Sequence, residues 1–187
     1  MKKWSKTIII LLVLLVIGSA ITIYRFTVPT IVPGSASMAN PIKSLEELEE
    51  RSAVIAEVTV SGKGKEDEND LPYTYTPVII TKVYKGNVSC GEEIEVREFY
   101  RYYRTPIGLY METIEDYLPM EKNGKYLLFL TETPSGTLSV AGIYYGKFVW
   151  PTPSKATRSA KSLEIFATDN DYLDILDAVV DNYGKSK

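Results

Sequence analysis

The sequence predicts a mainly β protein: an antiparallel barrel of five to six strands with a short N-terminal helix and an amphipathic C-terminal helix, preceded by one transmembrane helix. Three observations lead to this prediction. Residues 7–24 form an apolar segment without a charge. Behind it, short segments alternate apolar and polar side chains and are separated by glycine, proline and asparagine, which is typical of strands joined by turns. Strands and long helices do not alternate, so a parallel α/β sheet is not expected.

The apolar segment 7–24 has the length of a membrane span. As a helix it would cover about 27 Å, close to the thickness of the hydrocarbon core of a bilayer. Lys2, Lys3 and Lys6 precede it, whereas Arg25 alone follows it directly. Because positive flanks stay on the cytoplasmic side, we expect residues 1–6 to be a cytoplasmic head. The remainder is then extracytoplasmic, and the protein is a single-pass protein of the cell membrane.

A cleaved signal peptide is the alternative reading of this segment. The run Gly18-Ser19-Ala20 offers the small residues that signal peptidase accepts, so cleavage near Ala20 would release a secreted domain. Against cleavage, the apolar run continues through Ile21 and Ile23 and exceeds the usual core of a signal peptide. We therefore favour a retained signal-anchor. A lipoprotein is not expected, because no cysteine stands directly behind the segment.

Residues 25–43 and 44–187 are predicted to be a stalk and one extracytoplasmic domain. Prolines and a run of small residues make the stalk extended and unpacked. A capping box formed by Ser44 and Glu47 opens a short helix over residues 45–51. Alternation then predicts a series of strands, of which the one over residues 126–130 is apolar on both faces and most buried. They cover residues 54–60, 73–84 with an interruption at Pro77, 93–102, 126–130, 138–143 with a continuation toward 149, and 163–166.

Two further segments complete the domain. Prolines and a glycine within residues 105–120 predict an irregular excursion, with a helical turn around residues 112–116. A C-terminal helix capped by Asp169 or Asp171 carries apolar side chains at helical spacing. Its stripe comprises Tyr172, Leu173, Leu176, Val179, Val180 and Tyr183.

Composition narrows the function classes. Without the three N-terminal lysines the chain has 18 basic and 24 acidic residues, a net charge near −6, so nucleic acid is not an expected partner. A single cysteine, Cys90, excludes an internal disulfide, as in many cell-surface domains of Gram-positive bacteria. The chain has no histidine, which removes the usual general base and most zinc sites. We predict no catalytic residue, no metal site and no cofactor.

Four segments carry a resemblance to a known fold. They are residues 52–60, residues 75–86 ending in Lys85-Gly86, a Gly-x-x-Ile-x-Val strand at 91–96, and a Gly-x-Tyr-Leu-Leu-Phe-Leu strand at 124–130. The pattern resembles exported bacterial proteins of unknown function and is similar to the OB-fold barrel of the tissue-inhibitor-of-metalloproteinases and netrin-module superfamily. It covers about residues 44–150 and implies an OB-like barrel. Those inhibitors use an N-terminal cysteine and several disulfides, which this chain lacks, so inhibition is not carried over.

The segment of residues 99–104 is the candidate binding surface. Tyrosine and arginine are enriched in interfaces, because a rigid ring and a planar cation give contact area at a low entropy cost. The alternative is a cross-strand aromatic cluster that stabilises the sheet. The candidate binding residues are Tyr100, Arg101, Tyr102, Tyr103 and Arg104, together with Tyr73 and Tyr75.

Three functions follow as hypotheses. The first is a membrane-tethered, non-catalytic binding module that holds an envelope protein or wall polymer. The second is a carboxylate-dependent hydrolase or carbohydrate-active enzyme, which would need two carboxylates about 5–10 Å apart in one cleft. The third is a secreted OB-like inhibitor domain. The partner, apart from the membrane at residues 7–24, is not identified by the sequence.

Overall fold

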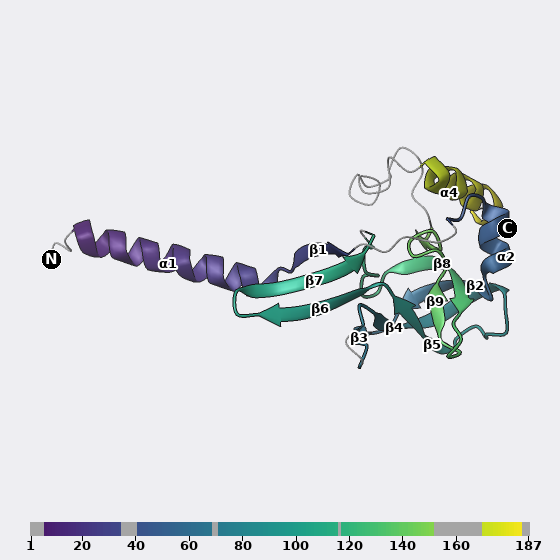
Figure 1. Cartoon of the computed structure of the whole chain (residues 1–187), viewed down its shortest axis with the longest axis horizontal. Coiled ribbons are helices and arrows are strands. Elements are labelled where there is room, and N and C mark those ends of the chain that lie inside the picture. The colour runs from purple at the N-terminus through teal and green to yellow at the C-terminus, as the bar shows by residue number, and fades with distance from the viewer. Residues whose placement is uncertain (1–5, 35–40, 69–70, 116, 152–169, 185–187) are drawn as a thin grey trace.

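The computed structural model describes residues 6–34, 41–68, 71–115, 117–151 and 170–184. The protein is mainly β, and its described part has three helices, α1 (Lys6–Thr27), α2 (Leu45–Arg51) and α4 (Asn170–Tyr183). The long helix α1 projects from the body of the molecule and meets it only at its C-terminal end, whereas α2 and α4 lie on the body (Figure 1). The predicted last strand over residues 163–166 and the predicted cap Asp169 lie outside the described residues.

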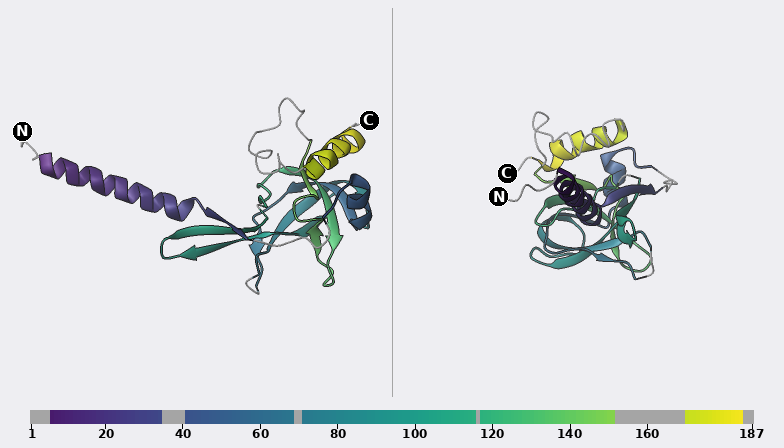
Figure 2. Two further views of the ribbon diagram at one scale, coloured as in Figure 1. Left: turned by 45° about the horizontal axis from the view of Figure 1, so that its top comes forward. Right: turned by 90° about the vertical axis from the view of Figure 1, so that its left-hand side faces the viewer.

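Five strands close into a barrel. They are β2 (Val54–Val60), β4 (Thr74–Lys85), β5 (Glu93–Glu98), β9 (Leu138–Val140) and β8 (Lys125–Glu132), paired in that order. The pairing of β9 with β8 closes the ring, which the view along α1 shows (Figure 2). The prediction of an antiparallel barrel is wrong for one pair of strands, because β5 and β9 pair in parallel. Two short strands extend the sheet, β3 (Lys65–Glu66) beside β4 and β10 (Lys147–Val149) beside β8.

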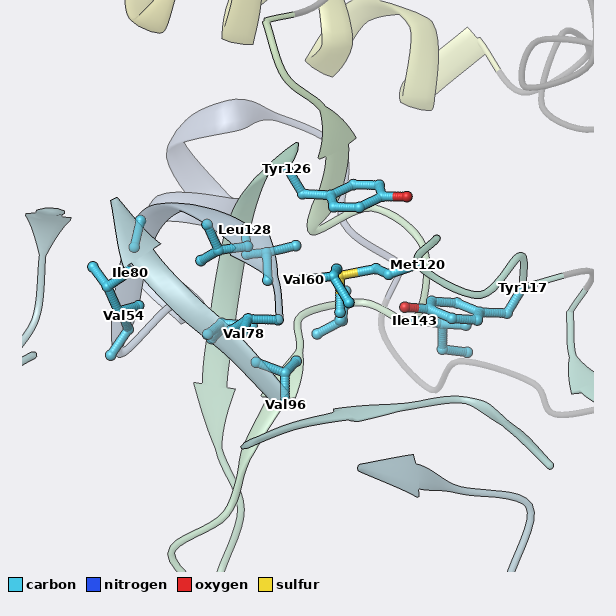
Figure 3. Close-up of a cluster of buried hydrophobic side chains, with 14 of the residues drawn as sticks. Val54, Val60, Val78, Ile80, Val96, Tyr117, Met120, Tyr126, Leu128 and Ile143 are labelled. Atoms are coloured by element: carbon cyan, nitrogen blue, oxygen red, sulfur yellow. The ribbon is translucent and has the colours of Figure 1, made fainter. Parts of the chain in front are cut away.

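The barrel interior is filled by the inward-facing apolar side chains of the strands (Figure 3). Every second residue of β2 points inward, as the sequence predicts, because successive side chains of a strand lie on opposite faces. The outward face of β8 is also buried, since α2 and α4 cover it. This second core explains why the 126–130 segment is apolar on both faces. It is formed by Ile55, Leu127 and Phe129 with Leu45, Leu48, Tyr172, Ile175, Leu176 and Val179.

The short helix α2 begins at the predicted N-cap Ser44, but the second bond of a capping box is formed with Lys43 in place of Ser44. The Glu47 backbone N–H donates to Ser44 Oγ at 3.2 Å, and the Glu47 carboxylate accepts from the Lys43 backbone N–H at 3.0 Å. The first of these bonds satisfies a donor that a helix N-terminus otherwise leaves free. The helix therefore starts at a fixed point and presents Leu45 and Leu48 to the second core.

A hairpin projects from the barrel toward α1. It consists of β6 (Tyr100–Thr105) and β7 (Gly108–Ile114), and it leaves the barrel at Phe99, directly after β5 (Figure 1). The irregular excursion and helical turn predicted for residues 105–120 are therefore wrong over β7. Pro106 forms the turn of the hairpin and does not interrupt a strand, which is a position that proline tolerates well.

The segment after α1 joins this hairpin. Strand β1 (Thr30–Gly34) pairs in parallel with β7, from Thr30 opposite Tyr110 to Gly34 opposite Ile114. The prediction that residues 25–43 are unpacked is wrong for β1 and for Ile42, whose side chain is buried in the second core. The prolines did not prevent pairing because β1 is an edge strand, where a missing N–H can face outward.

Candidate functional site

A cleft lies where the hairpin leaves the barrel. It has a volume of about 610 Å³. The loop around β3 forms one side, β4 and β6 form the floor, and the segment before β8 forms the other side. It is lined by Gly62, Lys63, Gly64, Lys65, Glu66, Thr74, Thr76, Tyr100, Tyr102, Pro119, Met120 and Lys122.

The floor of the cleft consists of hydroxyl-bearing side chains on β4 and β6, which belong to different sheets. Thr74 Oγ1 donates to the Tyr100 carbonyl at 2.8 Å, which ties β4 to the base of the hairpin. The rings of Tyr100 and Tyr102 meet edge to face at 5.6 Å. A Cβ at Gly64 would lie 2.4 Å from Thr74 Cγ2 and 3.2 Å from the Tyr100 hydroxyl oxygen. The loop can therefore close over this floor only with glycine at that position.

A buried ion pair supports the floor from behind. Glu98 is fully buried, and its carboxylate accepts hydrogen bonds from Thr76 Oγ1 at 2.5 Å, the Tyr117 hydroxyl at 2.8 Å and the Met120 backbone N–H at 2.8 Å. Lys147 Nζ lies 3.6 Å from this carboxylate and 3.6 Å from the centre of the Tyr117 ring. Lys147 also donates to the Leu118 carbonyl. A buried charge needs such compensation, because desolvation penalises it strongly.

Burial shifts the acid–base behaviour of this cluster. Desolvation lowers the pKa of Lys147 to about 8, and the neighbouring Glu98 carboxylate opposes the shift. Desolvation and then Glu98 hold the pKa of Tyr117 well above its usual value. Desolvation likewise raises the pKa of Tyr100 on the cleft floor. Both tyrosines therefore remain neutral at every physiological pH, and the Tyr117 hydroxyl remains a donor to Glu98.

The Lys147 ammonium is expected to lose its proton near pH 8 in the folded protein. With carbon-13 labelled lysine, its Cε resonance should titrate about two units below those of exposed lysines, whose pKa is about 10.4. Because the folded-state pKa is the lower one, the unfolded chain binds more protons between these two values, and this group's contribution to stability rises with pH in that window. A Lys147 titration that coincides with the exposed lysines would contradict the burial of this group.

Three lysines stand at the rim of the cleft. Lys63, Lys65 and Lys122 are exposed, and Lys65 pairs with Glu68 at 2.8 Å. Neither Lys63 nor Lys122 forms an ion pair with a described residue. Glu66 is the one carboxylate among the lining residues. Three lysines therefore stand against one carboxylate in the cleft lining, although Asp67, Glu68 and Glu121 adjoin these lysines in the sequence.

The seven predicted binding residues do not form one surface. Tyr100 and Tyr102 face the cleft, but Tyr100 is 5% exposed and belongs to the barrel core. On the opposite face of the hairpin, Arg101 pairs with its cross-strand neighbour Glu112 at 2.7 Å, and the ring of Tyr103 stacks on that of Tyr110 at 5.4 Å. That face has the geometry of the alternative interpretation, a cross-strand cluster that stabilises the sheet.

The remaining predicted residues lie apart from the cleft lining. Tyr73 contacts Phe99 and lies under the Arg97 guanidinium, 4.5 Å from its ring centre. Tyr75 donates to the Asp67 carboxylate at 2.8 Å, and Arg104 is exposed toward the end of the hairpin. Sequence reasoning missed Glu98, Lys147 and the rim lysines. The burial of Glu98 could have been predicted, because Glu98 lies on the same face of β5 as Ile94 and Val96, which point inward.

A second, shallower cleft of about 400 Å³ lies between α2 and the end of α4. Its glutamates, Glu46, Glu49 and Glu50, all come from one short helix. Tyr183 donates to the Glu49 carboxylate at 2.6 Å, and Lys85 Nζ donates to the Glu49 carbonyl at 2.6 Å. These bonds join α4 and β4 to α2. This cleft is therefore the boundary between elements that pack against one another.

Comparison with models of known protein families found no match, and a search of curated proteins found no similar chain.

Proposed function

We propose that this chain is a membrane-tethered, extracytoplasmic, non-catalytic binding module that holds an anionic wall polymer in the cleft at the base of the hairpin. The observation that carries the proposal is the lysine-rimmed mouth over a floor on which Tyr102 is half-buried and Tyr100, Thr74 and Thr76 are buried. Lysines attract phosphate or carboxylate groups, and hydroxyls and ring faces suit the polyol or sugar units of such a polymer.

The tether is supported by α1. Its residues Ile8–Thr27 form the one helix of the described chain that is long and apolar enough to cross a membrane, and its side chains are exposed along its length. Exposed apolar side chains on every face are typical of a lipid-facing helix. The lysines before it and Arg25 behind it favour an N-terminus in the cytoplasm. Cleavage near Ala20 would give a secreted form of the same module, and N-terminal sequencing of the mature protein distinguishes the two.

The cleft favours binding over the two alternative functions. A glycosidase-like reaction needs a pair of carboxylates in one cleft, whereas Glu66 is the single carboxylate lining this one and Glu98 lies behind the floor with its oxygens bonded. No group of three or more metal-ligating side chains occurs within the described residues. Inhibition as in the tissue inhibitors of metalloproteinases needs a free N-terminal cysteine. The cysteine of this chain, Cys90, is internal.

Replacing Lys63 and Lys122 by alanine should weaken binding of a purified teichoic-acid-type polymer at least tenfold, because two unpaired cations at the mouth are lost. The measurement is isothermal titration of the full chain in detergent at low and high salt. Affinity of the unaltered protein should fall with salt, since exposed charges are screened. The double variant should lose most of this salt dependence.

A matched control is the double variant Lys43→Ala/Lys125→Ala, which removes two exposed lysines that lie outside the cleft lining and form no ion pair with a described residue. Its affinity should equal that of the unaltered protein. Equal losses in both double variants would mean that only net charge matters, and the cleft proposal would be wrong. Tighter binding of polyglutamate than of the wall polymer would show that the cleft prefers an acidic protein segment.

A further inference from the structure

The hairpin formed by β6 and β7 points back toward the end of α1. Strand β1 follows α1 after two residues and runs parallel to β7, so both strands start at the same end of the three-stranded sheet. A Cβ at Gly108, the first residue of β7, would lie 2.8 Å from the Arg25 carbonyl oxygen. The turn of the hairpin therefore touches the last turns of α1 (Figures 1 and 2).

The turn and its surroundings expose apolar side chains. Ile107, in the turn itself, is 62% exposed. Val28, between α1 and β1, is 44% exposed, and Ile31, which lies opposite Met111 farther along the sheet, is 51% exposed. An isolated exposed isoleucine needs no explanation. Here, however, the exposed residues lie next to the end of an apolar helix, where a membrane that contains α1 would have its surface.

Charge at the turn fits the same surface. Arg25 and Arg104 are both exposed, and neither forms an ion pair with a described residue. Arg25 follows directly on the apolar run of α1, and Arg104 lies opposite Leu109 near the hairpin turn. Guanidinium groups at this height can pair with lipid phosphates, while the apolar side chain of Ile107 enters the headgroup layer.

We propose that the turn of the β6–β7 hairpin is a second contact with the membrane that α1 crosses, with Ile107 in the headgroup layer and Arg25 and Arg104 on lipid phosphates. This inference rests on the proposed tether. It adds that the β6–β7 hairpin brings the extracytoplasmic domain into direct contact with the outer leaflet. The partner is the lipid surface, because the turn is continuous with the membrane helix and carries both exposed apolar and cationic side chains.

The test places one probe at the hairpin turn. In a Cys90→Ser background, Ile107→Cys is labelled with an environment-sensitive fluorophore, and the full chain is reconstituted in vesicles of phosphatidylcholine and phosphatidylglycerol. The label should shift to the blue and should be quenched several-fold more by spin-labelled lipid headgroups than by aqueous iodide. The control is Ser135→Cys in the same background, an exposed position in the turn between β8 and β9. Its label should be quenched mainly by iodide.

The outcomes separate this inference from the proposed tether. Flotation of the same vesicles measures whether the chain is membrane-integrated after alkaline carbonate treatment. If the chain does not float, the tether proposal fails. If it floats and the Ile107→Cys label is as accessible to iodide as the Ser135→Cys label, the hairpin contact is wrong and the tether stands. Adding Arg104→Glu to Ile107→Cys should reduce the headgroup quenching, and an unchanged signal would overturn the role of the arginine.

Discussion

Replacing Lys147 by methionine is expected to lower the free energy of unfolding by about 3–5 kcal/mol, because it leaves a buried carboxylate without its counter-charge. Glu98 is fully buried, and the Lys147 ammonium 3.6 Å away is its counter-ion among the described residues. Methionine keeps about the length of the aliphatic stem of lysine and removes the ammonium, which lies over the Tyr117 ring. Chemical unfolding of the full chain in detergent measures the loss. In a Trp4→Phe background the emission reports on Trp150, which is buried.

The matched control for Lys147→Met is the double variant Glu98→Gln/Lys147→Met. Glutamine can still accept from Tyr117 and from the Met120 backbone N–H, and no charge is left in the barrel wall. The double variant should therefore be more stable than Lys147→Met alone, which is a coupling that a double-mutant cycle measures. If the two substitutions add independently, the ion pair is not the reason for the loss.

Replacing Phe129 by alanine is expected to cost about 3–5 kcal/mol, because it leaves a cavity in the second core. The Phe129 ring is fully buried and meets the rings of Phe148 and Tyr183 edge to face at 5.8 Å and 5.6 Å. It thus links β8 to α4. The melting temperature should fall by about 10 °C, and amide protons of α4 should exchange faster than those of β2.

Ile79→Ala is the control for Phe129→Ala. Ile79 lies on β4, and 38% of it is exposed on the outer face of the barrel. Its truncation should change the free energy of unfolding by less than about 1 kcal/mol. A similar loss in both variants would mean that α4 contributes little to the second core, and Phe129 would then be an ordinary strand residue.

The strands of the barrel could be predicted because their alternation is a local property. In β2, Val54, Ala56, Val58 and Val60 mark the inward face without any knowledge of the partner strands. The hairpin could not be predicted in the same way. The segment Glu112-Thr113-Ile114-Glu115 reads as the start of a helix, and only the pairing of β7 with β6 and β1 makes its first three residues a strand. Tertiary pairing therefore overrode a weak local preference.

The candidate site was predictable only in part. Tyr100 and Tyr102 were singled out by composition, and the cleft contains them. Their depth was not predictable, because the sequence does not show that the chain bends at Phe99 and that Tyr100 turns into the barrel. The rim lysines come from two loops nearly sixty residues apart, Lys63 and Lys122, and only closure of the barrel places them at one mouth.

If the cleft binds a ligand as proposed, the pairing of β1 with β7 restricts the space in which the barrel can meet that ligand. A free linker would let the barrel sweep a broad volume above its point of attachment, which lowers the effective concentration of the site at any one height. Here the hydrogen-bonded hairpin joins the end of α1 to the barrel (Figure 1). Six residues of β6, at about 3.4 Å each, make a spacer of about 20 Å. With α1 in a membrane, the cleft would sample one layer of the cell envelope and would ignore polymer that lies nearer or farther.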